Sequence, residues 1–234
     1  MLYDAKCGWY LPDGERHLPG WMASVNDARD GRLLYQGSKY RAAIDYCSDR
    51  RVAIDVGAHV GLWSWQMAKD FETVISFEPM PEHRDCYVEN LFGNDNLQNH
   101  DVVLIADALG AETGTAAIRC RTPGSSGDTG IEPDGEGEIV AVKRLDDVLR
   151  DYPGISDRVD FVKLDCEGYE LFALQGARET LLQNKPVVIV EQKGNKTGAG
   201  EKYGIGDFDA VEFLKDLGAK QRKHMVGDFV FSWD

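Results

Sequence analysis

Long apolar runs and a leader-like beginning are both absent from this 234-residue chain. A membrane helix needs roughly 18 consecutive apolar residues, and no run of the sequence approaches that length. The first ten residues, MLYDAKCGWY, lack the basic head and apolar core of a signal peptide. We therefore expect a cytoplasmic protein without a membrane anchor.

Basic residues are too few to balance the acidic ones. The chain has 26 Lys and Arg against 40 Asp and Glu, which gives a formal net charge of −14. This surplus of acid repels phosphate backbones, and the short basic stretches at 50–51 and 220–223 do not form a dense patch that would offset it. The composition therefore disfavours a nucleic-acid substrate and is compatible with a neutral or cationic partner.

Cysteine is scarce and scattered, and no CxxC pair occurs, whereas zinc ligands are usually closely spaced. The five cysteines are Cys7, Cys47, Cys86, Cys120 and Cys166. An odd, dispersed set is typical of reduced thiols in a cytoplasmic protein. We therefore predict neither disulfides nor a zinc site. At 43% hydrophobic residues, the chain can still build the core of an ordinary globular domain.

From Val52 onward, short apolar runs alternate with helical patterns. The expected strands cover 52–54, 73–77, 102–106, 159–164 and 187–190. The expected helices cover 62–69, 82–92, 169–182 and 208–217. Strands that alternate with helices predict a doubly wound α/β fold with a mostly parallel sheet, buried on both faces. The tail, 219–224 and 228–233 about a turn at Gly227, predicts a closing antiparallel hairpin.

Two segments depart from this alternation. Residues 1–50 are expected to be irregular at first and then to form a helix over 38–47, with Ser38 as its N-cap. We interpret them as an N-terminal extension to a domain that covers 51–234. Residues 122–137 contain five glycines and two prolines, which predicts a mobile loop between strands at 116–120 and 138–142. That loop is either a spacer or a flap near the substrate.

In open α/β sheets, ligands bind outside the carboxyl ends of the strands. The first strand ends in the sequence DVGAHVG at 55–61, where Gly57 permits a tight turn and Gly61 lets the next helix pack closely. A ligand is expected against the backbone N–H groups of this loop. The spacing is not GxGxxG, so the dinucleotide fingerprint is not met. The carboxylate of Asp55 suits an ammonium group better than a pyrophosphate.

Acids also follow the next two strands. Glu78 stands 23 residues beyond Asp55, and an acid about 20 residues past such a loop can accept hydrogen bonds from a ribose diol. The alternative is a surface acid before Pro79. Asp107 could accept a hydrogen bond from the adenine amino group while Leu109 packs on the ring, or it could be a plain turn residue.

The fourth strand ends in a denser cluster. Strand alternation puts Lys163, Asp165 and Glu167 on one side, either as a structural ion pair or as a cluster that orients the substrate and accepts its proton. The fifth strand adds Glu191 and Gln192 to the same rim. Two or three carboxylates there could instead hold Mg²⁺, although we favour a site without a metal.

Four motifs together resemble the FkbM family of methyltransferases: DVGAHVG at 55–61, FEP at 77–79, VKLDCEGYE at 162–170 and LQGA at 174–177. The resemblance runs from about Val52 to the C-terminus. It implies a class I methyltransferase (Rossmann-like) fold with a seven-stranded sheet, S-adenosylmethionine as the methyl donor, and O-methylation of small molecules or sugars.

The resemblance also assigns residues to the cofactor. Those expected at its amino-acid end are Asp55, Gly57, Ala58, His59 and Gly61. Those expected at its ribose and adenine are Glu78, Asp107, Ala108 and Leu109. The family commonly has Asn where this chain has His59, but both side chains can donate a hydrogen bond. Residues 1–50 are then expected to cap the cofactor site and to shape the acceptor pocket, with Tyr35, Gln36 and Tyr40 as the polar candidates.

Methyl transfer from a sulfonium is an in-line displacement, so the protein mainly aligns the acceptor with the methyl group. A hydroxyl acceptor must also lose its proton to a general base. The candidates are Asp165, Glu167, His59 and Glu191, of which we predict Asp165 or Glu167. The expected acceptor is a small molecule such as a sugar or a secondary metabolite. The rival interpretations are a nicotinamide-dependent oxidoreductase and a cofactor-binding module without catalysis.

Overall fold

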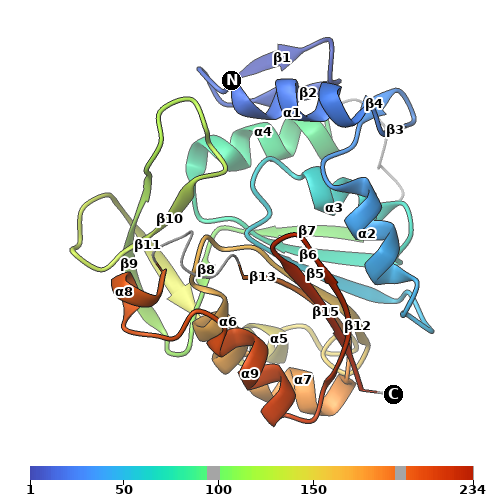
Figure 1. Ribbon diagram of the computed structural model, residues 1–234, viewed down its shortest axis with the longest axis vertical. Coiled ribbons are helices and arrows are strands. Elements are labelled where there is room, and N and C mark those ends of the chain that lie inside the picture. Colours follow the sequence, from blue (N-terminus) through green and yellow to red (C-terminus); the bar gives the residue numbers. More distant parts are fainter. Residues whose placement is uncertain (94–100, 193–198, 234) are drawn as a thin grey trace.

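The computed structural model describes residues 1–93, 101–192 and 199–233, and is built around a seven-stranded sheet (Figure 1). The order across the sheet is β7-β6-β5-β12-β13-β15-β14. The strands are β5 (Val52–Val56), β6 (Thr73–Phe77), β7 (Asp101–Ile105), β12 (Val159–Leu164), β13 (Val187–Glu191), β14 (Lys220–Met225) and β15 (Asp228–Ser232). Strands β5, β6, β7, β12 and β13 pair in parallel, whereas β15 is antiparallel to both of its neighbours. The predicted doubly wound sheet and its closing hairpin are confirmed.

Helices cover both faces of this sheet (Figure 1). One apolar layer joins Ala53 and Phe161 to α1 (His17–Val25), α2 (Gly37–Ile44), α3 (Leu62–Ala68) and α4 (Pro81–Leu91). The other joins Ile54 and Val162 to α5 (Leu145–Arg150), α6 (Glu170–Gly176), α7 (Arg178–Asn184) and α9 (Asp209–Asp216). Because neighbouring strand residues point to opposite faces, the continuous apolar strands fill both layers.

A second sheet stands beside the first and pairs its strands in the order β10-β9-β11-β8. Its strands are β8 (Ala108–Leu109), β9 (Gly114–Cys120), β10 (Thr129–Glu132) and β11 (Glu138–Lys143), and α8 (Ala199–Tyr203) lies nearby. The prediction of a mobile loop over 122–137 is therefore wrong in part, because β10 pairs antiparallel with β9. The glycines there permit the turns on either side of β10 rather than a structureless span.

The N-terminal residues are more regular than their sequence suggests. Strands β1 (Leu2–Asp4) and β2 (Trp9–Leu11) form one hairpin, β3 (Ala28–Arg29) and β4 (Arg32–Leu33) form another, and α1 lies between them. The expected irregular start is wrong because α1 accommodates Pro19 in its first turn, where the missing N–H needs no partner within the helix. The side chain of Trp9 is buried and packs edge-on against Trp65, so the segment shares the core of the main domain. The domain boundary at 50/51 stays a prediction.

Two helix boundaries also differ from expectation. Helix α2 begins at Gly37 after Gln36, which has a φ of +53°, so Ser38 is not its N-cap. The helix predicted over 169–182 is divided into α6 and α7 at Ala177, where φ is −105° and ψ is 7°. At Gly176, the last residue of α6, a Cβ atom would lie 2.0 Å from the carbonyl oxygen of Gly110, so the backbone packs closely against the residue after β8 at the point where the helix ends. None of the described helices is long and apolar enough to cross a bilayer.

Candidate active site

A cavity opens at the carboxyl ends of β5, β6 and β12. The strand order reverses between β5 and β12, and open α/β sheets bind ligands at such a switch point. Together with the open solvent space at its mouth, the cavity encloses about 920 Å³. The predicted site residues that line it are Gly57, Ala58, His59, Glu78, Asp107, Ala108, Leu109, Asp165 and Glu167. Asp55 and Gly61 do not line it.

The glycine loop after β5 is shaped by two close approaches. At Gly57, with a φ of +74°, a Cβ atom would lie 2.0 Å from the carbonyl oxygen of Asp165. At Gly61, with a φ of +88°, it would lie 2.4 Å from Cδ1 of Leu91. The positive φ values and these close approaches disfavour a side chain at both positions. Gly57 permits the tight turn as predicted, whereas the neighbour that crowds Gly61 belongs to α4 and not to the strand on which the next helix was expected to pack. The expectation that the loop offers backbone N–H groups to a ligand is not met at Gly57 and Ala58, because both groups donate to the carbonyl of Phe77.

Asp55 lies beneath the cavity floor rather than in its wall. It is fully buried, and Oδ2 accepts a hydrogen bond of 2.6 Å from Ser64. Nζ of Lys163 lies 3.0 Å from Oδ1 of Asp55 and forms an ion pair with it, although the geometry is not that of a hydrogen bond. The same Nζ donates a hydrogen bond of 2.7 Å to the carbonyl oxygen of Gly57. Burial lowers the pKa of Lys163, but the nearby acids, chiefly Asp55 and then Asp165, together outweigh that effect and the pKa is raised. The structural ion pair is therefore present, and a direct contact of Asp55 with the cofactor stays a prediction.

Glu78 is held rigidly in the cavity wall. Its side chain is buried, Oε2 accepts the backbone N–H of His59 at 2.7 Å, and Oε1 accepts that of Met80 at 2.9 Å. Nδ1 of His83 lies 3.3 Å from Oε1. Each carboxylate oxygen can accept two hydrogen bonds, so Oε2 keeps capacity for a ligand hydroxyl. The geometry fits the predicted ribose contact.

The predicted adenine side is built by the second sheet. Ala108 and Leu109 form β8, which pairs in parallel with β11, and both side chains are buried. Ile118 of β9 contributes another apolar lining residue. Asp107 lies 2.7 Å from Nζ of Lys143, so that salt bridge orients its carboxylate. An apolar slot with one carboxylate at its edge suits a purine ring.

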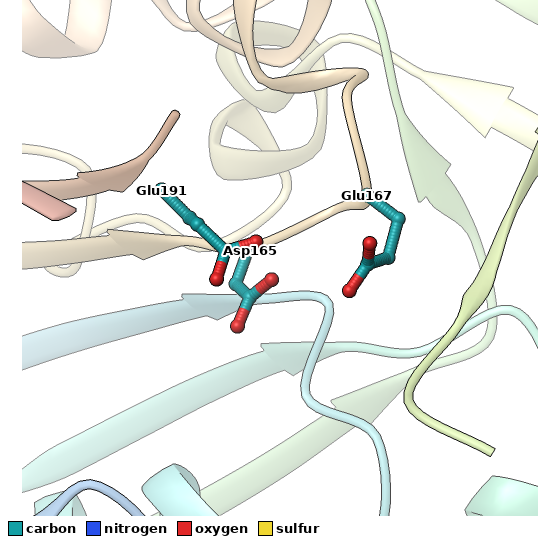
Figure 2. Close-up of side chains that lie close together, drawn as sticks. All are labelled: Asp165, Glu167 and Glu191. Atoms are coloured by element: carbon teal, nitrogen blue, oxygen red, sulfur yellow. The ribbon is translucent and has the colours of Figure 1, made fainter. Parts of the chain in front are cut away.

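Three acids gather at the other end of the cavity. Carboxylate oxygens of Asp165, Glu167 and Glu191 lie within 4.8 Å of one another, and Figure 2 shows these side chains close together at the ends of β12 and β13. Such a set could hold a hard cation such as Mg²⁺. Asp165 and Glu167 line the cavity, but Glu191 does not. The side-chain oxygen of Gln192 accepts a hydrogen bond from the backbone N–H of Val211 in α9, so this side chain is held at α9 and not in the cavity.

Glu170 fixes the loop that carries Asp165 and Glu167. Glu170 is buried, and Oε1 accepts the N–H groups of Cys166 at 2.8 Å and Gly168 at 3.1 Å. Burial raises the pKa of Glu170, and it also raises that of the Cys166 thiol, one of five free cysteines. Glu167 takes a φ of +52°, an uncommon conformation for a residue other than glycine. Glu170 therefore positions Asp165 and Glu167.

Of the polar candidates in the N-terminal segment, Tyr35 lines the cavity roof, whereas Gln36 and Tyr40 do not, and the other roof residues were not predicted. Leu18 and Tyr35 from the N-terminal segment line the roof, as do Trp63 of α3 and Ser126 and Thr129 from the 122–137 segment. Residues of both segments therefore border the cavity, while the roles of 1–50 as a cap and of 122–137 as a flap stay predictions. The glycines and prolines of 122–137 were the available signal for a flap, but nothing local in the sequence joins that segment to the N-terminal one.

Solved structures of similar fold include methyltransferases. A Clostridium thermocellum protein provisionally named an rRNA-methylase has a TM-score of 0.50 and 13% identity, over 85% of this chain and 93% of that one. The FkbM methyltransferase of Methylobacillus flagellatus KT has a TM-score of 0.48 and 18% identity, over 78% of this chain and 43% of that one. The protein has the class I, Rossmann-like methyltransferase fold.

Sequence comparison then gives the family. The methyltransferase FkbM domain matches residues 55–220, and the chain therefore belongs to the FkbM methyltransferase family. It is also similar to methyltransferase sdnD of Sordaria araneosa, with 29% identity over 170 residues. That match covers 59% of this chain and 64% of the relative's length.

Proposed function

We propose that this protein transfers the methyl group of S-adenosylmethionine to a hydroxyl of a small molecule such as a sugar. The observation that carries the proposal is the arrangement along one cavity of a rigidly held Glu78, the apolar slot of Ala108 and Leu109, and the acids Asp165 and Glu167. The first two groups suit an adenosine, and the third suits a polar acceptor that must lose a proton.

The residues act mainly by placement. Glu78 accepts a hydrogen bond from the ribose, and Asp107 and Leu109 border the adenine. The donor supplies an activated methyl group, so alignment accounts for much of the rate. Asp165 or Glu167 accepts the proton of the hydroxyl as the new bond forms. If the acids instead hold Mg²⁺, they lower the pKa of that hydroxyl through the metal.

Calorimetric titration tests the cofactor assignment. Wild type is titrated with S-adenosylmethionine, S-adenosylhomocysteine and, separately, NAD⁺, and the series is repeated with Glu78→Gln and with Glu82→Gln, an exposed acid of α4 that serves as the matched control. We expect wild type and Glu82→Gln to bind both sulfur compounds equally, and Glu78→Gln to bind them more weakly while it stays folded at the titration temperature. Binding of NAD⁺ alone, or of none of the three, would refute the proposal.

A further inference from the structure

A chain of side chains links the N-terminal segment to the glycine loop across the roof of the cavity. Glu15 accepts both the backbone N–H of Ser126, at 2.6 Å, and its hydroxyl. Nε2 of His59 lies 2.8 Å from Oγ of that same Ser126. Three segments that are distant in sequence thus meet at one hydroxyl, and two of the three residues line the cavity.

The donors and acceptors in this chain can be assigned. Glu15 also accepts the first two N–H groups of α1, from His17 and Leu18. Burial raises the pKa of Glu15, but the hydrogen bonds that it accepts, chiefly from Ser126, outweigh burial and lower it. The carboxylate is therefore ionised at neutral pH and can only accept.

The assignment fixes the tautomer of His59. A serine hydroxyl has one hydrogen, and that of Ser126 is donated to Glu15. Oγ of Ser126 must then accept from His59, so the proton of the imidazole is on Nε2. Burial, with His83 and Lys163 nearby, lowers the pKa of His59 well below its usual value, so Nδ1 carries a lone pair at neutral pH.

That lone pair has a free direction. Among the described residues, none forms a hydrogen bond with Nδ1 of His59, and this atom is not one of the sealed polar atoms that lack a partner. The ring of His83 packs edge-on at 4.4 Å on one side. His59 lines the cavity, so a ligand bound there can approach its imidazole ring.

We infer that Glu15 and Ser126 lock His59 as the Nε2–H tautomer, so that Nδ1 accepts a hydrogen bond from an N–H or O–H donor of the bound ligand. Two sources fit this chemistry: the ammonium group of the methyl donor, whose expected partner Asp55 is already paired with Lys163, and the hydroxyl of the acceptor. His59 is then a ligand-binding residue, while Glu15 and Ser126 are positioning residues. The inference rests on the proposed function for the identity of the ligand, but not for the tautomer.

The tautomer is read first, in the protein without ligand. Nitrogen-15 NMR of protein labelled at histidine distinguishes a protonated ring nitrogen from one with a lone pair, and His59→Asn assigns the signals. We expect wild-type His59 to be protonated at Nε2 and Ser126→Ala to lose that preference. Ser125→Ala, a neighbour outside the cavity lining, is the matched control and should match wild type. A wild-type proton on Nδ1 would overturn the inference.

Binding then separates the two sources. S-adenosylhomocysteine carries the ammonium group, whereas 5′-methylthioadenosine lacks the amino-acid end. If the ammonium is the donor, Ser126→Ala weakens the first about threefold to tenfold, the effect of one hydrogen bond, and leaves the second unchanged. If the acceptor hydroxyl is the donor, both affinities hold and turnover falls.

Equality of Ser126→Ala with Ser125→Ala in both affinity and turnover would overturn the ligand role. Failure of wild type to bind S-adenosylhomocysteine would instead contradict the proposed function, and the tautomer measurement would stand apart from it.

Discussion

At the residue scale, His59 makes the folded protein sensitive to acid. Its folded-state pKa is lowered, first by burial and then by neighbouring positive charge. The groups that face it are His83 of α4, Lys163 of β12, Glu78 through the backbone N–H, and Glu15 through Ser126. As the pH falls below about 6.5, His59 becomes protonated in the unfolded chain but stays neutral in the folded protein. The stability that neutral His59 contributes is therefore complete above that pH and is lost below it.

We expect wild type to lose more thermal stability between pH 7 and pH 5 than His59→Asn, because that variant removes the titrating group. Asparagine tolerates the φ of +54° at this position, so the variant should fold. The difference between the two melting-temperature curves isolates His59 from the other four histidines. Parallel curves would show that burial does not perturb this imidazole.

Asp165 and Glu167 are compared directly by removing one charge at a time. Asp165→Asn or Glu167→Gln should slow methyl transfer about 10²- to 10⁴-fold, the usual contribution of a general base, because the acceptor proton loses its destination. Turnover is measured with labelled S-adenosylmethionine on acceptors found by screening, with Asp157→Asn, a residue distant from the motif, as control. Full activity in both variants would exclude Asp165 and Glu167 as the base, and loss of activity with a chelator, restored by Mg²⁺, would reassign these acids to a metal.

Which residues could be predicted from the sequence depended on how local their partners are. Gly57, Glu78 and Asp165 follow strands directly, so the strand pattern already placed them at one edge of the sheet. The contact of Glu15 with Ser126 spans 111 residues, and that of Ser126 with His59 spans 67. No periodicity or turn signal encodes such pairs, which is why most of the cavity roof was missed. Asp55 was assigned to a ligand because its partner Lys163 is equally remote.

At the scale of elements, the parallel strands were predictable and the breaks between elements were not. Strand β12 has the predicted bounds, because a short apolar run is the sequence pattern of a strand that is buried on both faces. The division of α6 from α7 coincides with the close approach of Gly176 to Gly110, and β10 is defined by its pairing with β9. Both are tertiary contacts that the local pattern does not encode.

Two glycine variants, one at the ends of β5 and β12 and one in an open turn, test how closely these two strand ends approach. Gly57 and Gly154 both have positive φ, +74° and +86°, but a Cβ atom at Gly154 meets nothing within 4 Å. Both alanines should pay the backbone cost of about 1–2 kcal/mol, and Gly57→Ala should lose clearly more because it also displaces the backbone of Asp165. Chemical denaturation of both variants measures the difference, and equal losses would mean that the two strand ends do not approach as described.

At the scale of the whole molecule, the N-terminal segment and the main domain share one core. Trp9 is buried against Trp65, and its indole N–H donates to the carbonyl of Leu33 at 2.7 Å. Trp9→Ala should therefore cost about 3–5 kcal/mol and lower the midpoint of a single unfolding transition. The exposed Tyr3→Ala is the control. Two separate transitions in calorimetry would instead show that residues 1–50 fold as an independent unit.

The whole cavity is assembled from parts that no single motif contains: the glycine loop, the second sheet, the acidic strand ends and the N-terminal roof. We expect an adenosine-bearing methyl donor to occupy this cavity. The most direct measurement is a crystal structure with S-adenosylhomocysteine bound. We predict the ribose hydroxyls within hydrogen-bonding distance of Glu78 and the adenine between Asp107 and Leu109. A ligand bound elsewhere, or a cavity that stays empty at saturating concentration, would contradict the assignment.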